Sequence, residues 1–175
     1  SVPLRTIKQI EFPVAVVNKM LGDANFTITA ITRYSRGDVT YSSSNTSVAT
    51  VNANTGEITL IGTGTSTITA TQAAWNGFAR VQTTYTLNVS ATALQLSWSD
   101  MSKTFGDADF DLSLTPPTSN NNAGGFTYSL APNANTNVVS INGNTVHILN
   151  VGTTTIRATQ AASNGYAAGY VDAQL

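Results

Sequence analysis

The stretch Thr67-Ile68-Thr69-Ala70-Thr71-Gln72-Ala73-Ala74-Trp75-Asn76-Gly77-Phe78 returns 88 positions later as Thr155-Ile156-Arg157-Ala158-Thr159-Gln160-Ala161-Ala162-Ser163-Asn164-Gly165-Tyr166. A match of this length does not arise by chance, so the chain is one unit written twice. Self-similarity at a fixed period indicates an architecture in which each repeat is one structural module.

The match extends along the chain at offsets that drift between 84 and 90 positions. The segment Lys19–Phe26 recurs as Lys103–Phe110, and Ser47–Asn52 is answered by Asn137–Asn142. Such drift places small insertions in the connecting loops, where β-proteins tolerate them. We therefore predict two domains, residues 1–90 with an N-terminal extension at 1–7, and residues 91–175. Because few free residues join them, we expect a semi-rigid junction.

The composition of the chain excludes several classes of function. Charged residues make up 10% of the chain, hydrophobic residues 41%, and the formal net charge is −1. This balance excludes a charge-dominated disordered chain and argues against a nucleic-acid partner, which would need clustered Lys and Arg. Cysteine is absent, which removes disulfides and thiolate metal sites. No apolar run reaches the ~20 residues of a membrane span, so no membrane insertion is expected.

Alternation with a period of two indicates β-strands. Val81, Thr83, Tyr85, Leu87 and Val89 alternate with polar residues, which places one face on a core and the other in water. The pairs Asn76-Gly77, Thr55-Gly56, Asn142-Gly143 and Asn164-Gly165 supply turn residues that accept positive φ. About seven short strands per unit, with turns every ~8–12 residues, predict an all-β fold of two tandem immunoglobulin-like β-sandwiches.

Two stretches resemble a known family. The residues Thr40–Val51 and Thr55–Ala70 resemble the signature of bacterial Ig-like domains, group 2. The second unit departs from that pattern at Leu130-Ala131-Pro132, where the family has a Ser-rich run. The resemblance implies a place in the stalk of a bacterial surface adhesin or in an appendage of a phage virion. It therefore implies an extracellular location, on a virion or on a bacterial cell surface.

The acidic run Asp107-Ala108-Asp109-Phe110-Asp111 could supply oxygen ligands to calcium. An EF-hand loop would need Gly and Glu where Leu112 and Thr118 stand. The alternative, which we favour, is a strand with Ala108, Phe110 and Leu112 facing inward. We predict no metal site and no cofactor.

Catalysis finds no support in the residues. His147 is the single histidine, and no pair of carboxylates is placed for acid–base work. Lys19 and Lys103 stand at equivalent positions, where an isopeptide cross-link to Asn is conceivable. A solvated ammonium on a packed stem is the preferred interpretation. We expect a non-enzymatic protein with no catalytic residues.

Trp75 is the candidate binding residue, because its counterpart is Ser163 and a core position would be apolar in both copies. We predict that Trp75 and Phe78 are exposed aromatics at a loop tip beside Asn76, with Tyr34 on a neighbouring loop. The alternative is that Trp75 folds over its own loop or covers the neighbouring domain.

Trp98 is interpreted differently. It is matched to Val14 at an offset of 84, while Leu94 and Leu96 are matched to Ile10 and Phe12. Apolar residues fill all of these positions, so this face is expected to belong to the core.

The function expected from the sequence is a structural or interaction module, a spacer, stalk or decoration within a phage virion or bacterial surface appendage. Its partners would be other subunits of that assembly, or a host-surface protein or glycan. The alternative is a receptor- or carbohydrate-binding adhesin module that uses loop-tip aromatics. Because the last residues, 170–175, alternate like a strand cut short, we also expect the chain to be a piece of something longer.

Overall fold

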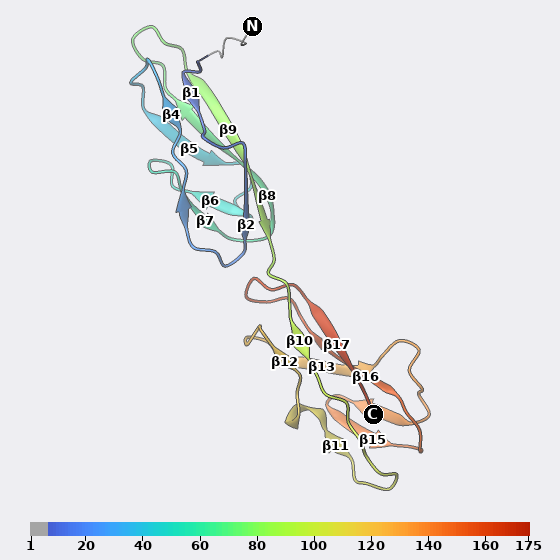
Figure 1. Cartoon of the computed structure of the whole chain (residues 1–175). Coiled ribbons are helices and arrows are strands. Elements are labelled where there is room, and N and C mark those ends of the chain that lie inside the picture. The colour runs from blue at the N-terminus through green and yellow to red at the C-terminus, as the bar shows by residue number, and fades with distance from the viewer. Residues whose placement is uncertain (1–6) are drawn as a thin grey trace, which may run out of the picture. The chain divides into compact units, whose positions relative to one another are not determined.

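The computed structural model describes residues 7–175, and these fall into two compact units that divide between Ala91 and Thr92 (Figure 1). The predicted domain boundaries and the semi-rigid junction remain predictions, and positions 1–6 of the predicted N-terminal extension lie outside the described residues. Within residues 7–175, no helix is long and apolar enough to cross a membrane.

The first unit is built from three small sheets. The largest has the order β2-β9-β8-β5, with β2 parallel to β9 and the other pairs antiparallel. The others have the orders β3-β7-β6 and β1-β4. The strands are β1 (Ile10–Glu11), β2 (Val16–Met20), β3 (Phe26–Thr27), β4 (Ile31–Thr32), β5 (Val39–Ser43), β6 (Ala49–Val51), β7 (Glu57–Leu60), β8 (Gly64–Gln72) and β9 (Val81–Ser90).

The second unit repeats this topology with the sheets β13-β16-β17, β11-β15-β14 and β10-β12. It has no strand that corresponds to β2 among its assigned elements. Its elements are β10 (Leu96–Ser97), β11 (Phe110–Asp111), a short 3-10 helix η1 (Leu112–Leu114), β12 (Thr118–Ser119), β13 (Phe126–Leu130), β14 (Val139–Asn142), β15 (Thr145–Ile148), β16 (Thr155–Gln160) and β17 (Gly169–Gln174).

The cores lie between the sheets and follow the period-two pattern. In the first unit Ile68 of β8 and Tyr85 and Leu87 of β9 pack with Ile58 of β7, and each is almost fully buried. Burying a side chain of this size stabilises the fold by about 1.5–3 kcal/mol. In the second unit Ile156 of β16 takes the same place. The predicted all-β, immunoglobulin-like sandwich is confirmed.

The predicted pairing of Trp98 with Val14 is wrong. Val14 is exposed, and the side chain that packs on Tyr41 and Tyr85 is Phe12. Trp98 packs correspondingly on Tyr128. The local offset is therefore 86, because the first unit carries two extra residues between Phe12 and Lys19.

The predicted strand through the acidic run is also wrong in part. Only Phe110 and Asp111 form a strand, and a 3-10 helix follows at once. Leu112 is buried as expected, whereas Ala108 is exposed. The Asp111 side chain accepts a hydrogen bond from the Ser113 N–H at 2.8 Å. This cap begins the helix and ends the alternation.

Tyr85 gives a prediction about stability. Its ring stacks edge-on against Phe12, and its hydroxyl is buried without a hydrogen-bond partner among the described residues. An unsatisfied buried hydroxyl costs about 1–3 kcal/mol. Tyr85→Phe is therefore expected to raise the free energy of unfolding by about 1 kcal/mol in urea denaturation at pH 7. A loss of stability would contradict the buried, unpaired hydroxyl.

The same residue predicts a dependence on alkaline pH. Burial, with a smaller contribution from Tyr41, raises the pKa of Tyr85 to about 12. Above pH 10 the unfolded chain loses this proton while the folded one keeps it, so stability falls between pH 10 and 12. The loss specific to Tyr85 is about 2–3 kcal/mol, since one pKa unit corresponds to ~1.4 kcal/mol. The stability difference between the wild type and Tyr85→Phe should widen over this range.

Candidate functional site

Trp75 and Phe78 face each other across a tight hairpin. Each N–H donates to the other's carbonyl, at 3.0 Å from Trp75 and 2.8 Å from Phe78. Asn76 and Gly77 between them have φ of 44° and 87°. Positive φ at both central residues is the geometry of a type I′ turn, for which Asn-Gly is the preferred pair. The predicted hairpin turn is confirmed. Asn76 contributes to it through its positive φ.

The two aromatic side chains remain partly open to solvent. Trp75 is 39% exposed and Phe78 is 37% exposed. Both belong to the hairpin apex, because residues 73–80 are all exposed. A large apolar surface held on a rigid two-residue turn loses little conformational entropy when it is covered by a partner.

Tyr34 stands on a strained turn. The Ser35 N–H donates to the Arg33 carbonyl at 2.8 Å, so the backbone closes a three-residue γ-turn around Tyr34, whose φ is 69°. This conformation is rare for a bulky residue and costs on the order of 1–3 kcal/mol. Tyr34 is 61% exposed, so no burial of its ring offsets that cost. Strain kept at an exposed aromatic motivates a functional hypothesis.

The Tyr34 loop and the Trp75 hairpin are in direct contact. A Cβ atom built on Gly37 would lie 2.1 Å from the Ala73 carbonyl oxygen and 3.3 Å from the Trp75 Cβ. The Ala73 N–H donates to the Asp38 carbonyl at 2.8 Å. Only glycine permits this approach. The structure therefore brings the four sequence-predicted residues, Tyr34, Trp75, Asn76 and Phe78, onto two adjoining loops.

A buried glutamine holds the Tyr34 loop. The Gln72 amide nitrogen donates to the carbonyls of Ser35 and Gly37, at 3.1 and 3.3 Å. Its oxygen accepts from the Gln9 side chain at 2.9 Å. Gln72 is almost fully buried, so these bonds are made away from water. Sequence reasoning missed this residue, although Ile68, Ala70 and Gln72 share the core-facing side of one strand.

The second unit contains the same device. The Gln160 amide nitrogen donates to the carbonyls of Asn121 and Gly124, at 2.9 and 2.8 Å. The Ser119 hydroxyl donates to its oxygen at 2.6 Å. The duplicated Thr-Gln-Ala-Ala segment therefore has two roles in each unit. It forms the end of a strand, and its glutamine side chain holds the neighbouring loop through hydrogen bonds to that loop's carbonyls.

The two hairpins differ in how they are covered. In the second unit the Asn121 amide donates to the Ser163 hydroxyl and carbonyl, at 2.9 and 3.2 Å. The Thr92 N–H donates to the Gly165 carbonyl at 2.7 Å, and Thr92 accepts from Ala167 at 2.9 Å. This apex is half-buried by its own unit, whereas the apex at 75–78 is exposed.

Tyr34 has no counterpart in the second unit. The Arg33 N–H donates to Gln9, as the Asn120 N–H does to Gln95. The Ser35 carbonyl accepts a hydrogen bond from the buried amide of Gln72. The Asn121 carbonyl accepts the equivalent bond from Gln160. Asn120 and Asn121 are adjacent, so Tyr34 is an extra residue inserted only in the first unit.

The carboxylates of the acidic run point to separate partners. Asp107 accepts from the Thr104 N–H at 2.9 Å, and Asp109 pairs with His147 at 2.5 Å. The hydrogen bonds from Ser113 lower the pKa of Asp111. No group of three or more metal-ligating side chains gathers within the described part of the chain.

The equivalent lysines lie over aromatic rings. The Lys19 ammonium is 4.6 Å from the centre of the Phe26 ring, and the Lys103 ammonium is 4.7 Å from that of Phe110. In both copies the ammonium itself makes a cation–π contact, whereas the sequence led us to prefer a solvated ammonium on a packed stem. Neither lysine is fully buried, as an isopeptide cross-link would require.

An exposed cation–π cluster marks the outer face of the second unit. Arg157 binds Asp172 through two hydrogen bonds of 2.8 and 2.9 Å and stacks 3.5 Å from the centre of the Tyr170 ring. The hydrogen bonds from Arg157 lower the pKa of Asp172. These contacts join side chains of the neighbouring strands β16 and β17, so we interpret the cluster as stabilising the sheet.

A family model described as "Intimin, immunoglobulin-like domain" matches residues 31–74. The matched segment runs from the strand before Tyr34 to the residue before Trp75. It covers about a quarter of the chain and relates the first unit to the Ig-like domains of bacterial adhesins. No curated protein matches the chain.

Several solved structures are similar at low identity. One is the Drosophila N-cadherin EC1-4 structure, with 13% identity, a TM-score of 0.33, and coverage of 95% of this chain and 49% of that one. Another is a SusE-like surface-located polysaccharide-binding protein from the Bacteroides thetaiotaomicron heparin utilisation locus, with 15% identity, a TM-score of 0.33, and coverage of 97% and 33%. The chain thus spans half or less of these two.

Proposed function

We propose that this chain is a non-enzymatic, extracellular interaction module of a surface protein, and that it binds its partner through Tyr34, Trp75 and Phe78. The observation that carries the proposal is the asymmetry between the two units. The residues that are the same in both units form the buried strand end and hold the neighbouring loop. At the positions that differ, the first unit has exposed aromatic residues on a strained turn and on a tight hairpin. In the second unit the equivalent hairpin is half-buried.

The side chains of Tyr34, Trp75 and Phe78, which we call the tip, limit the kind of partner that can bind there. Exposed aromatic rings bind flat apolar surfaces, such as the face of a sugar ring or an apolar patch on a protein. Arg36 and Arg80 stand exposed on the same two segments and can donate to hydroxyl or carbonyl oxygens at the rim. The match to an adhesin-type Ig-like model supports a contact with another surface rather than chemistry.

Trp75→Ser tests this function, because Ser163 shows that the same hairpin forms with serine at that position. The variant is expected to bind at least about ten-fold more weakly, as truncating an aromatic hot spot costs about 2 kcal/mol or more. Its melting temperature should stay within a few degrees of the wild type. Binding is measured on a glycan array and on a panel of immobilised extracellular proteins.

The matched control is Tyr170→Ser, an exposed aromatic on the second unit that the proposal leaves out of the contact. It should bind as the wild type does. Equal binding by wild type and Trp75→Ser, or no binding to any glycan or protein, would remove the tip from the function.

The spacer, stalk or virion-decoration role predicted from the sequence rests on the family resemblance. It concerns the assembly around the chain and is compatible with a binding tip.

A further inference from the structure

Positive charge gathers on the segments that adjoin the tip. Four of the five Lys and Arg residues described in the first unit stand there: Lys8, Arg33, Arg36 and Arg80. Arg36 belongs to the Tyr34 loop, and Arg80 follows Phe78 by two positions. The segment of Lys8 adjoins both, because its carbonyl accepts from Arg33 at 3.3 Å and the next side chain, Gln9, donates to the Ala79 carbonyl at 3.4 Å.

Three of these cations are not engaged by the protein itself. The Arg33 guanidinium is held, since it donates to the Glu11 carboxylate at 2.7 Å and to the Lys8 carbonyl. Lys8, Arg36 and Arg80 are exposed, and within residues 7–175 none of them forms an ion pair. Three charged donors therefore surround the exposed rings with their hydrogen-bonding capacity open to a ligand.

The second unit carries no charge where the first has these three cations. The residues that correspond to them are Leu94, Asn122 and Ala168. The stretches around them, 94–97, 120–125 and 161–168, contain no charged residue at all. The charge therefore differs between the units together with the aromatic residues, and the fold that both units share does not need it.

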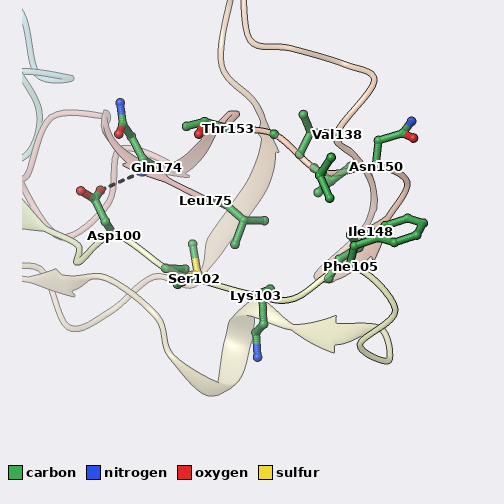
Figure 2. A pocket seen from close by; sticks show the side chains of 14 residues that line it. Asp100, Ser102, Lys103, Phe105, Val138, Ile148, Asn150, Thr153, Gln174 and Leu175 are labelled. Carbon is green, nitrogen blue, oxygen red and sulfur yellow. Dashed lines mark hydrogen bonds between the residues drawn. The ribbon is translucent and has the colours of Figure 1, made fainter.

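A cavity in the second unit offers no comparable set of cations. It has a volume of about 350 Å³ and is lined by two charged residues, Asp100 and Lys103 (Figure 2). The Asp100 carboxylate accepts a hydrogen bond from the Gln174 N–H at 2.8 Å, and the Lys103 ammonium lies over an aromatic ring. Both charges are therefore already engaged by the second unit.

We infer, on the premise of the function proposed above, that the tip binds an acidic polysaccharide. The sugar rings stack on the exposed aromatic residues of the tip. Carboxylate or sulfate groups on the same sugars accept hydrogen bonds from Lys8, Arg36 and Arg80. A guanidinium fork binds such groups through two parallel hydrogen bonds, which fixes their position as well as their charge.

The size of the aromatic surface favours a polysaccharide over an acidic protein. The exposed parts of Tyr34, Trp75 and Phe78 amount to roughly 200–350 Å² together, since a whole aromatic side chain presents ~150–250 Å². A stable protein contact covers about 800 Å² on each partner, around a centre depleted of charge. An acidic sugar has a flat apolar face and an anionic group in one unit, which matches a few rings rimmed by cations.

The test measures binding of the 175-residue chain to four immobilised probes: dextran sulfate, alginate, uncharged dextran and poly-L-glutamate. Both acidic polysaccharides should bind at least about ten-fold more tightly than dextran, which lacks the anion, and than polyglutamate, which lacks the sugar ring. The double variant Arg36→Gln/Arg80→Gln should bind them at least about ten-fold more weakly than the wild type. Its slope of log affinity against log salt should fall from about −3 to about −1, because two of three cations are gone.

The matched control is Lys19→Gln/Lys103→Gln, which lowers the formal net charge from −1 to −3 as the arginine pair does but leaves the surroundings of the tip intact. It should bind as the wild type does. Equal losses in the two double variants, or equal binding to polyglutamate, would overturn the inference, because net charge alone would then explain the attraction. Failure of the wild type to bind either acidic polysaccharide would overturn it as well.

Trp75→Ser separates this inference from the proposed function. It should weaken binding to both acidic polysaccharides at least about ten-fold, as the arginine pair does. If Trp75→Ser weakens binding to a glycan or protein that the arginine pair binds normally, the proposed function stands and the acidic ligand is overturned. If both variants bind every ligand as the wild type does, the proposed function fails together with the inference.

Discussion

Replacing Gln160 by Leu is expected to lower the free energy of unfolding of the second unit by about 3–4 kcal/mol. Leu nearly conserves the volume but removes three hydrogen bonds, those with the carbonyls of Asn121 and Gly124 and with the hydroxyl of Ser119. Each lost hydrogen bond costs about 0.5–1.5 kcal/mol, and the carbonyl of buried Asn121 costs about 1–3 kcal/mol when it stays unsatisfied. Gln72→Leu should act similarly in the first unit.

Such a loss is a large share of the total, because a unit of ~85 residues is stable by roughly 4–13 kcal/mol. The measurement is urea unfolding, followed by Trp98 fluorescence for Gln160→Leu in a Trp75→Phe background and by Trp75 fluorescence for Gln72→Leu in a Trp98→Phe background. The control is Gln82→Leu, whose amide bonds Thr71 on the exposed face of the sheet. That change should stay within about 0.5 kcal/mol. Equal effects at positions 82 and 160 would contradict the role of the buried amides.

Gly37→Ala is expected to destabilise the first unit by about 3 kcal/mol and to weaken binding at the tip. The new methyl group would lie 2.1 Å from the Ala73 carbonyl oxygen, so the Tyr34 loop has to move away from the hairpin. Overpacking against the backbone costs typically about 1–3 kcal/mol, and here no flexible side chain can give way. The separation of Tyr34 from Trp75 should reduce affinity by at least ten-fold if both contact one partner, equivalent to about 1.4 kcal/mol.

The control is Gly125→Ala in the second unit, where an added Cβ meets nothing within 4 Å. It should leave the unfolding midpoint and the binding unchanged. If Gly37→Ala binds as tightly as the wild type while Trp75→Ser does not, Tyr34 and Trp75 do not form one surface.

The sequence predicted the architecture because the repeat and the strand period report the same thing. The alternation of residues 81–89 appears in β9 as buried Tyr85, Leu87 and Val89. The Asn76-Gly77 turn followed from the backbone preferences of those two residues alone. Both features are local, and local chemistry decides them.

What the sequence left open depends on contacts between distant segments. The pairing of Trp98 with the wrong residue arose because an insertion before Lys19 leaves no signal except a drift in offset. Tyr34 was singled out as an aromatic, but its status as an inserted residue on a γ-turn needed the pairing of Arg33 with Gln9. The role of Gln72 depends on its hydrogen bonds to the carbonyls of Ser35 and Gly37, which lie more than 30 positions away in the sequence. The sequence alone therefore does not distinguish it from the other polar residues.

The central claim is that the first unit meets its partner through the Trp75 hairpin, and quenching of Trp75 fluorescence by acrylamide tests it most directly. Trp98→Phe, which copies Phe12 at the equivalent position, makes Trp75 the only tryptophan of the chain. We predict ready quenching in the free protein, as expected for a tryptophan residue that is 39% exposed, and a several-fold lower quenching constant once the protein is bound to its glycan or protein surface. Tight binding that leaves Trp75 as open to acrylamide as before would contradict the claim.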